Sequence, residues 1–163
     1  MPKGVIIMQV NEIMTKNVVF CSPNDPVKHA ARLLREHKVG GIPVVQDSKV
    51  TGMITESDIL KLLEVPERDS QLWLPSPFEI IEVPLRELIG WEEASHALDD
   101  VGNKMVSDVM SHPVVTADVS ESLETVASRM VKHNVVRVPV IKDSELVGIV
   151  TRHDIIAGLA LSA

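Results

Sequence analysis

The chain has 163 residues, of which 45% are hydrophobic, and carries a formal net charge of −7 at pH 7. It is long enough to bury a sizeable core as one domain or as two small ones. The acidic balance argues against a general nucleic-acid binder and against adhesion to an anionic membrane, because both need a basic face. The apolar runs are short, no signal-peptide pattern is visible, and Cys21 is the only cysteine, so we expect a cytoplasmic protein without a membrane span or an intrachain disulfide.

The first part of the chain, residues 8–63, alternates between β-rich and helix-like patterns. Apolar residues recur three and four positions apart from Val27 onward, with charged residues on the opposite face, which predicts an amphipathic helix. Two near-continuous apolar runs then flank a turn at Asp47-Ser48, as expected for strands covered on both faces. The expected elements are a strand over 18–21, a helix from Val27 that ends at Gly40-Gly41, strands over 42–45 and 50–54, and a helix over about 57–63.

Residues 64–103 differ in composition from the rest of the chain. The segment holds Trp73, Phe78 and Trp91, three of the four aromatic residues, and its four prolines favour an extended backbone around residues 74–77. One interpretation is a linker that covers an exposed face with its own aromatic side chains. The other is a lid over a ligand or a contact surface for a partner.

Residues 104–161 repeat the first unit at a constant offset of 96 positions, without a gap. A gapless match of this length indicates that one structural unit was built twice. The order strand, helix, strand, strand, helix is therefore predicted a second time. The expected elements are a strand over 114–116, a helix over 123–133, strands over 138–141 and 146–150, and a last helix from near His153.

The most distinctive repeated stretch is Gly, two apolar residues, Thr, two variable residues and Asp, at 52–58 and again at 148–154. Thr followed three positions later by an acid at a helix start is close to a capping box, so one interpretation is structural. A carboxylate there can also accept both vicinal hydroxyls of a ribose, and the free amides of the helix start favour an oxyanion. The two roles are compatible, because Thr can cap the helix while Asp points into a cleft.

The repeated order of elements, with Pro-Val-Val-x-Asp at residues 43–47 and the Gly-to-Asp stretch at both third strands, resembles the CBS domain. Two such units in tandem resemble a Bateman module, and the resemblance covers nearly all of the chain outside residues 64–103 and the first few residues. It implies an α/β fold of two repeats, 8–63 and 104–161, each β-α-β-β-α with a small mixed sheet, related by a pseudo-twofold axis and packed as one disc. It also implies a regulatory, non-enzymatic protein, commonly a homodimer, which binds AMP, ADP, ATP, S-adenosylmethionine or its breakdown products and acts on a partner protein yet to be identified.

The resemblance also implies two clefts between the copies. In the family, the Thr and Asp hold the ribose and nearby phosphate, apolar segments enclose the adenine, and each cleft combines residues of both copies. The implied first cleft contains Met53, Thr55, Asp58, Val114, Val115, Val136, Arg137 and His153. The implied second cleft contains Ile149, Thr151, Asp154, Val18, Val19, Gly40, Gly41 and Ser57.

Arg137 has Gly41 as its counterpart in the first copy, and this difference predicts unequal clefts. In nucleotide-sensing members of the family, an Arg or His at this position reaches ligand phosphates. The first cleft is expected to prefer a phosphorylated adenosine, because an Arg–phosphate fork is directional and stronger than a neutral hydrogen bond. The second, without a matching Arg, is expected to take a neutral or cationic adenosyl compound or to stay empty. A surface ion pair with a carboxylate is the other interpretation of Arg137.

No group of residues predicts catalysis or a metal site. The six histidines include no closely spaced pair, Cys21 has Ala117 as its counterpart, and no phosphate-binding glycine loop is present. A second hypothesis is a protein that keeps this fold, binds no nucleotide and works through dimerisation and residues 64–103. A third and weaker hypothesis is an enzyme that uses the clefts for catalysis.

Overall fold

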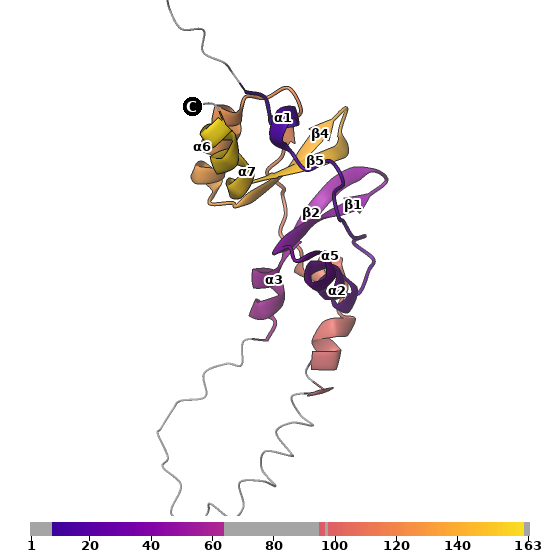
Figure 1. Cartoon of the computed structure of the whole chain (residues 1–163). Coiled ribbons are helices and arrows are strands. Elements are labelled where there is room, and N and C mark those ends of the chain that lie inside the picture. Colours follow the sequence, from indigo (N-terminus) through magenta and orange to yellow (C-terminus); the bar gives the residue numbers. More distant parts are fainter. Residues whose placement is uncertain (1–7, 64–94, 97, 162–163) are drawn as a thin grey trace, which may run out of the picture.

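The computed structural model describes residues 8–63, 95–96 and 98–161 (Figure 1). It has two antiparallel hairpins with helices packed around them, which confirms the predicted α/β class with two packed repeats and small sheets. The elements in chain order are α1 (Val10–Ile13), α2 (Val27–His37), β1 (Gly41–Gln46), β2 (Lys49–Thr55), α3 (Glu56–Lys61), α5 (Val106–Val109), β3 (Ala117–Asp118), α6 (Leu123–His133), β4 (Arg137–Lys142), β5 (Glu145–Thr151) and α7 (Arg152–Leu161).

Each repeat is centred on a tight hairpin, β1–β2 in the first and β4–β5 in the second. Their turn residues, Asp47 with Ser48 and Asp143 with Ser144, all have positive φ, between 51° and 69°. Two-residue hairpins of type I′ need this left-handed conformation at both central positions, because it matches the twist of the strands. Both turns lie where the sequence predicts them.

The first strand of each repeat is shorter than predicted and lies further along the chain. In place of strands over 18–21 and 114–116, the structure has one parallel bridge from Cys21 to Val44 and the two-residue strand β3, which pairs with β4. Cys21 and its repeat equivalent Ala117 are 2% and 1% exposed. The chain joins the hairpin only from these buried positions onward, so β-propensity alone placed the strands too early.

The two long helices, α2 and α6, bury an apolar face and end in a left-handed residue. Lys38 follows α2 with φ 54°, and Asn134 follows α6 with φ 51°. Such a residue turns the chain away from the helix axis and frees the last carbonyl groups for capping bonds. The expectation that Gly40-Gly41 stops the first helix is therefore wrong, because Lys38 already closes it after His37.

The lead segment of each repeat, which contains α1 in the first and α5 in the second, packs on the other repeat. α1 lies against α7 and β5, and Thr15 exchanges backbone hydrogen bonds of 2.9 and 3.0 Å with Ile149. In the same way α5 lies against α2 and β2, and Ser111 exchanges bonds of 2.8 and 3.0 Å with Met53. Figure 1 shows α5 beside α2, although the two are far apart in the sequence. The repeats have thus exchanged their lead segments.

Each hydrophobic core consequently contains residues of both repeats. Val10 of α1 is fully buried in the core of the second repeat, and Val106 of α5 is fully buried in the core of the first. Met14 lies over Gly148, and Met110 lies over Gly52 in the equivalent way, so close that a Cβ on either glycine would overlap the methionine sulfur. The two glycines allow the exchanged segments to approach β5 and β2.

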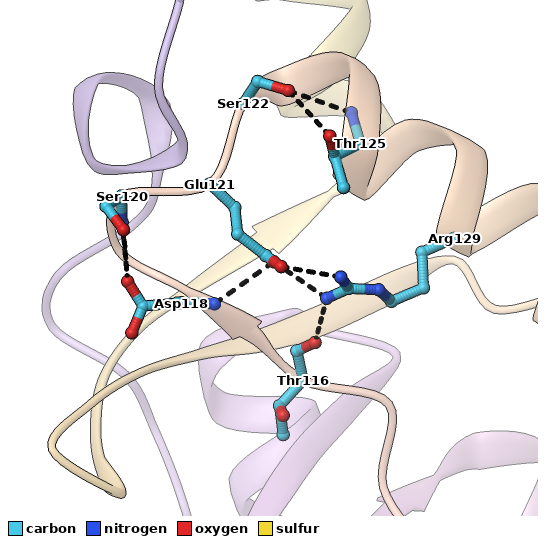
Figure 2. A network of polar contacts seen from close by, with 7 residues as sticks. All are labelled: Thr116, Asp118, Ser120, Glu121, Ser122, Thr125 and Arg129. Atoms are coloured by element: carbon cyan, nitrogen blue, oxygen red, sulfur yellow. Dashed lines mark hydrogen bonds and ion pairs between the residues drawn. The ribbon is translucent and has the colours of Figure 1, made fainter.

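A polar network joins α6 to the loop before it (Figure 2). Arg129 donates from Nη2 and Nη1 to the two carboxylate oxygens of Glu121, at 2.7 and 2.8 Å, and Nη1 also donates to the Thr116 carbonyl at 2.6 Å. The equivalents of Glu121 and Arg129 in the first repeat are Asp25 and Leu33. This ion pair is therefore a feature of the second repeat that the first cannot form.

Only the end of the segment between the repeats is described. Residues 98–103 are helical, and Asn103 Oδ1 accepts a hydrogen bond of 2.9 Å from Lys28 Nζ. The interpretations of Trp73, Phe78 and Trp91 concern residues outside the described ranges. Among the helices that the structure describes, none has the length and apolar character needed to cross a membrane.

Candidate functional site

A cavity of about 370 Å³ lies where the β2–α3 junction meets the start of β4, and we call it the Asp58 cavity. Both repeats form its walls, as the resemblance to the CBS domain implies. Five of the residues assigned to the first cleft line it: Met53, Thr55, Asp58, Val136 and Arg137. Six further residues that the sequence did not single out for this cleft also line it: Gly40, Glu56, Ser57, Ser111, Asn134 and Val135.

A second cavity, of about 290 Å³, lies at the corresponding place on the other side of the repeat junction, and we call it the Thr151 cavity. It too is built from both repeats. Six residues assigned to the second cleft line it: Val18, Val19, Gly40, Gly41, Ile149 and Thr151. Its other lining residues are Thr15, Asn17, Lys38, Val39, Ile42 and Arg137. Most of the lining positions in the two cavities are related by the offset of 96, which matches a pseudo-twofold arrangement.

Some of the predicted site residues do not line either cavity. Val115 packs against the core of the second repeat, and His153 is exposed near the start of α7. Val114 and Asp154 are half-buried, and neither lines the Asp58 cavity or the Thr151 cavity. Ser57, assigned to the second cleft, lines the first cavity instead. Ligand contacts by Val114, Val115, His153 and Asp154 stay predictions.

Thr55 and Asp58 form a complete capping box at the start of α3. Asp58 Oδ2 accepts from the Thr55 amide at 2.9 Å and from Thr55 Oγ1 at 2.8 Å, while the Asp58 amide donates to Thr55 Oγ1 at 3.2 Å. The other carboxylate oxygen, Oδ1, accepts from Ser111 Oγ at 3.1 Å. An ionised carboxylate has about four acceptor sites, so Oδ1 retains capacity for a further donor in the cavity.

The same box is present at the start of α7. Asp154 Oδ2 accepts from the Thr151 amide at 2.7 Å and from Thr151 Oγ1 at 2.8 Å, and the Asp154 amide donates to Oγ1 at 3.3 Å. The structural interpretation of the repeated Thr and Asp is therefore correct for both copies. It does not exclude ligand binding, because in each box the cap occupies only one carboxylate oxygen.

Arg137 lies at the boundary of the two cavities and lines both of them. It is half-buried, and its guanidinium lies over the backbone of Gly40 and Gly41. Burial lowers the pKa of Arg137 below its usual value, and the nearby carboxylate of Glu56 partly opposes this shift. Because arginine stays protonated in proteins, the side chain is a partly desolvated cation.

The charges around the cavities differ from the expected ones. The charged residues that line the Asp58 cavity are Glu56, Asp58 and Arg137, whereas those that line the Thr151 cavity are Lys38 and Arg137. The premise that the second cleft lacks an Arg is therefore wrong, because Arg137 lines both cavities. Positions 41 and 137 are repeat equivalents, but their contact, which places Arg137 at the pseudo-twofold axis, is visible only in the structure.

The architecture defines a class of protein. It is a tandem α/β repeat whose copies exchange their lead segments and enclose clefts at their junction. The family model for the CBS domain matches residues 10–65 and 106–161, and the chain belongs to this family. It is 39% identical over 155 residues to the uncharacterized protein MJ1426 of Methanocaldococcus jannaschii, covering 94% of this chain and 92% of that protein. It is 30% identical over 146 residues to the CBS domain-containing protein YhcV of Bacillus subtilis, covering 90% and 81%.

Two solved structures of CBS proteins with bound ligands share the fold. One is the CBS domain pair of protein MJ0100 in complex with 5′-methylthioadenosine and S-adenosyl-L-methionine, with a TM-score of 0.68 and 26% identity over 96% of this chain and 99% of that one. The other is CBSX2 in complex with AMP, with a TM-score of 0.66 and 25% identity over 95% and 98% of the two chains.

The described residues also bear on the chemistry of metals and thiols. Within residues 8–63, 95–96 and 98–161, no group of three or more His, Cys, Asp or Glu side chains is placed to hold a metal ion. Cys21 is buried in the core of the first repeat, and burial together with the charge of Asp25 raises the pKa of its thiol to about 12. A thiol of this kind is protonated at neutral pH and a poor nucleophile.

Proposed function

We propose that the chain is a regulatory module that binds an adenosine-containing ligand in the Asp58 and Thr151 cavities. In this proposal residues 8–63 and 104–161 are the two sensing repeats, and residues 64–103 connect them. The support is membership of the CBS family, together with two structural relatives that hold AMP or S-adenosylmethionine and methylthioadenosine. The cavity volume of about 370 Å³ lies at the lower end of the range for small-molecule sites, and that of about 290 Å³ lies just below it.

The observation that carries the proposal is the state of the Asp58 carboxylate. Its Oδ2 is used by the helix cap, whereas Oδ1 receives a hydrogen bond from Ser111, a residue of the other repeat that lines the same cavity as Asp58. An acceptor in this position suits a ribose hydroxyl, because a hydrogen bond to a charged group is stronger than one between neutral groups. Met53 and Val136 supply apolar surface in the same cavity.

Sensing follows from the fact that both repeats contribute to each cavity. A ligand bound there contacts both repeats at once, so it stabilises the arrangements of the repeats in which the contacts fit. A second copy or a partner protein then detects the change. Leu60 on α3 and its repeat equivalent Ile156 on α7 are 62% and 66% exposed. These apolar side chains favour self-association, and we propose a homodimer through the helix faces that carry them.

The test is a calorimetric titration of adenosine, AMP and S-adenosylmethionine into the wild type, Asp58→Ala and Asp58→Asn. Asn keeps one acceptor oxygen for the cap but removes the charge and the second acceptor, so Asp58→Asn should fold and bind at least about tenfold more weakly in one site. Asp99→Asn, an exposed aspartate that lines neither cavity, is the matched control and should bind like the wild type. Unchanged binding by a folded Asp58→Asn would contradict the role of this carboxylate.

The exposed apolar helix residues also support a second candidate, an interaction module that binds no nucleotide. That function predicts no binding heat with any of the three compounds, together with a dimer in analytical ultracentrifugation that Leu60→Glu dissociates. Binding heat that Asp58→Asn weakens would exclude it.

A further inference from the structure

Positions 41 and 137 are repeat equivalents, and in the structure they meet. The Arg137 guanidinium lies so close to Gly40 and Gly41 that an added Cβ on Gly40 would be 2.9 Å from Nη2, and one on Gly41 would overlap Nη1 and lie 2.9 Å from Thr55 Cγ2. Real Cβ atoms essentially never come this close to another heavy atom. The space at the pseudo-twofold axis therefore holds one large side chain, which comes from the second repeat.

Because it lies at this axis, Arg137 is a wall of both cavities. One guanidinium cannot form the same short, charge-assisted contacts with two phosphate groups in separate cavities without dividing its donors between them. The other charged residues do not compensate equally. Lys38 is the second cation of the Thr151 cavity, whereas the Asp58 cavity has only the carboxylates of Glu56 and Asp58 beside Arg137.

We propose that Arg137 couples the two cavities, so that a phosphate-bearing ligand in one weakens the binding of a phosphate-bearing ligand in the other. This inference rests on the proposed function and concerns its regulation. Ligands without phosphate do not compete for the guanidinium, so two of them bind independently. The chain then holds one phosphorylated adenosine firmly, and a neutral adenosyl compound can fill the remaining cavity beside it.

The charges also assign the order of filling. Two cations and no carboxylate line the Thr151 cavity, so the first phosphate binds there, with Arg137 and Lys38 as partners. With the guanidinium engaged on that side, a second phosphate in the Asp58 cavity faces Glu56 and Asp58 without a cation in the wall. Like charges within one cavity repel each other, so the second phosphorylated ligand binds more weakly than the first.

The experiment compares adenosine with AMP, which differ only in the phosphate, by calorimetric titration of the full chain. For each compound, the measured quantity is the ratio of the second dissociation constant to the first. In the wild type, this ratio is expected to be at least about tenfold larger for AMP than for adenosine. In Arg137→Gln, the ratio for AMP should fall toward that of adenosine without reaching it, because Lys38 and the two carboxylates still make the cavities unequal for a phosphate. Repulsion between two phosphates alone would keep the ratio high in Arg137→Gln, so the variant separates sharing from simple repulsion.

Two variants complete the design. Arg152→Gln removes an exposed arginine that lines neither cavity and should keep the wild-type ratio. Lys38→Gln should weaken the first AMP and leave adenosine unchanged, because Lys38 lies only in the Thr151 cavity. The coupling is overturned if two AMP molecules bind wild type as independently as two adenosines, or if Arg137→Gln keeps the ratio. If neither compound binds, the proposed function fails, and the coupling fails with it.

Discussion

At the scale of single residues, Thr55 and Asp58 combine a structural and a chemical property. The sequence predicts both, because an acid three positions after a threonine at a helix start is a capping signal wherever it occurs. Only the structure shows that the cap uses Oδ2 and that Ser111 reaches Oδ1 from the other repeat. That contact depends on the exchange of lead segments, which no local pattern encodes.

Arg137 shows the opposite case, in which the sequence identifies the residue but misplaces its side chain. Comparison of the copies singled out Arg137 against Gly41 and assigned it to one cleft. In the structure it lines both, because an unbranched chain of several bonds can lie across two glycines that offer no side chain of their own. Residue type and spacing do not determine such a direction, since it depends on what stands opposite.

Cys21 gives a prediction of pH dependence at this scale. Its thiol has a pKa of about 12 in the folded protein, whereas the ordinary value of 9.0 applies to the unfolded chain. Between these values the unfolded state loses the proton and the folded state keeps it, so the contribution to stability is complete below pH 9 and decreases as the pH rises. The free energy of unfolding should therefore fall by up to about 1.4 kcal/mol per pH unit from this group.

Urea unfolding of the wild type and of Cys21→Ala at pH 7 and pH 10 measures this effect. Alanine occupies the equivalent buried position 117, so Cys21→Ala should fold and lose less stability than the wild type between the two pH values. Equal losses in the two proteins would show that the buried thiol is not responsible. In the folded wild type at pH 8, Cys21 should also be unreactive toward a disulfide reagent.

At the scale of the elements, the long helices, the hairpins and the short lead helices at 9–14 and 105–110 could be predicted, whereas the extent of the first strands and the partners of the lead helices could not. Periodicity over eleven residues defines α6 at Leu123–His133, as expected, and the two-residue turns fix the hairpins. A strand of two residues such as β3 leaves no periodic signal. Which core receives α1 or α5 is also invisible, because four-residue helices carry too few apolar positions to specify a partner.

The exchange of lead segments makes a prediction at the contact of Met110 with Gly52. A Cβ on Gly52 would overlap Met110 Sδ and lie 2.9 Å from its Cγ, so Gly52→Ala should destabilise the fold by about 1–3 kcal/mol. Met110→Ala removes the atoms that clash and leaves room for the new methyl group. The double variant should therefore be more stable than the sum of the single effects implies, with a coupling energy of about 0.5–3 kcal/mol.

Urea denaturation of the wild type, both single variants and the double variant gives the four free energies of unfolding for this double-mutant cycle. All three atoms nearest to the added Cβ belong to Met110, which makes this pair cleaner than Met14 with Gly148, where the Thr15 carbonyl lies 3.2 Å away. If the effects of Gly52→Ala and Met110→Ala on the free energy of unfolding were strictly additive, the contact between Met110 and the first repeat would be contradicted. The same cycle with Val109→Ala in place of Met110→Ala is the control and should show little coupling.

At the scale of the whole molecule, the two cores are not independent, since each contains a helix from the other repeat. The cavities lie at the junction that these crossovers hold together, so a ligand there acts on the complete structure. The repeat in the sequence predicted two similar units, and the resemblance to the CBS domain implied clefts between them. It could not show that the units depend on each other, because an internal repeat is equally compatible with two separately folding domains.

The measurement that tests the central claim most directly is thermal unfolding of the full chain, alone and with AMP, S-adenosylmethionine or methylthioadenosine. We expect a single cooperative transition, and a ligand present at a hundred times its dissociation constant should stabilise the folded state by about 2.7 kcal/mol. Asp58→Asn should reduce this stabilisation, whereas Asp99→Asn should not. No stabilisation by any of the three compounds, with the wild type correctly folded, would contradict the proposal that these cavities sense adenosine-containing ligands.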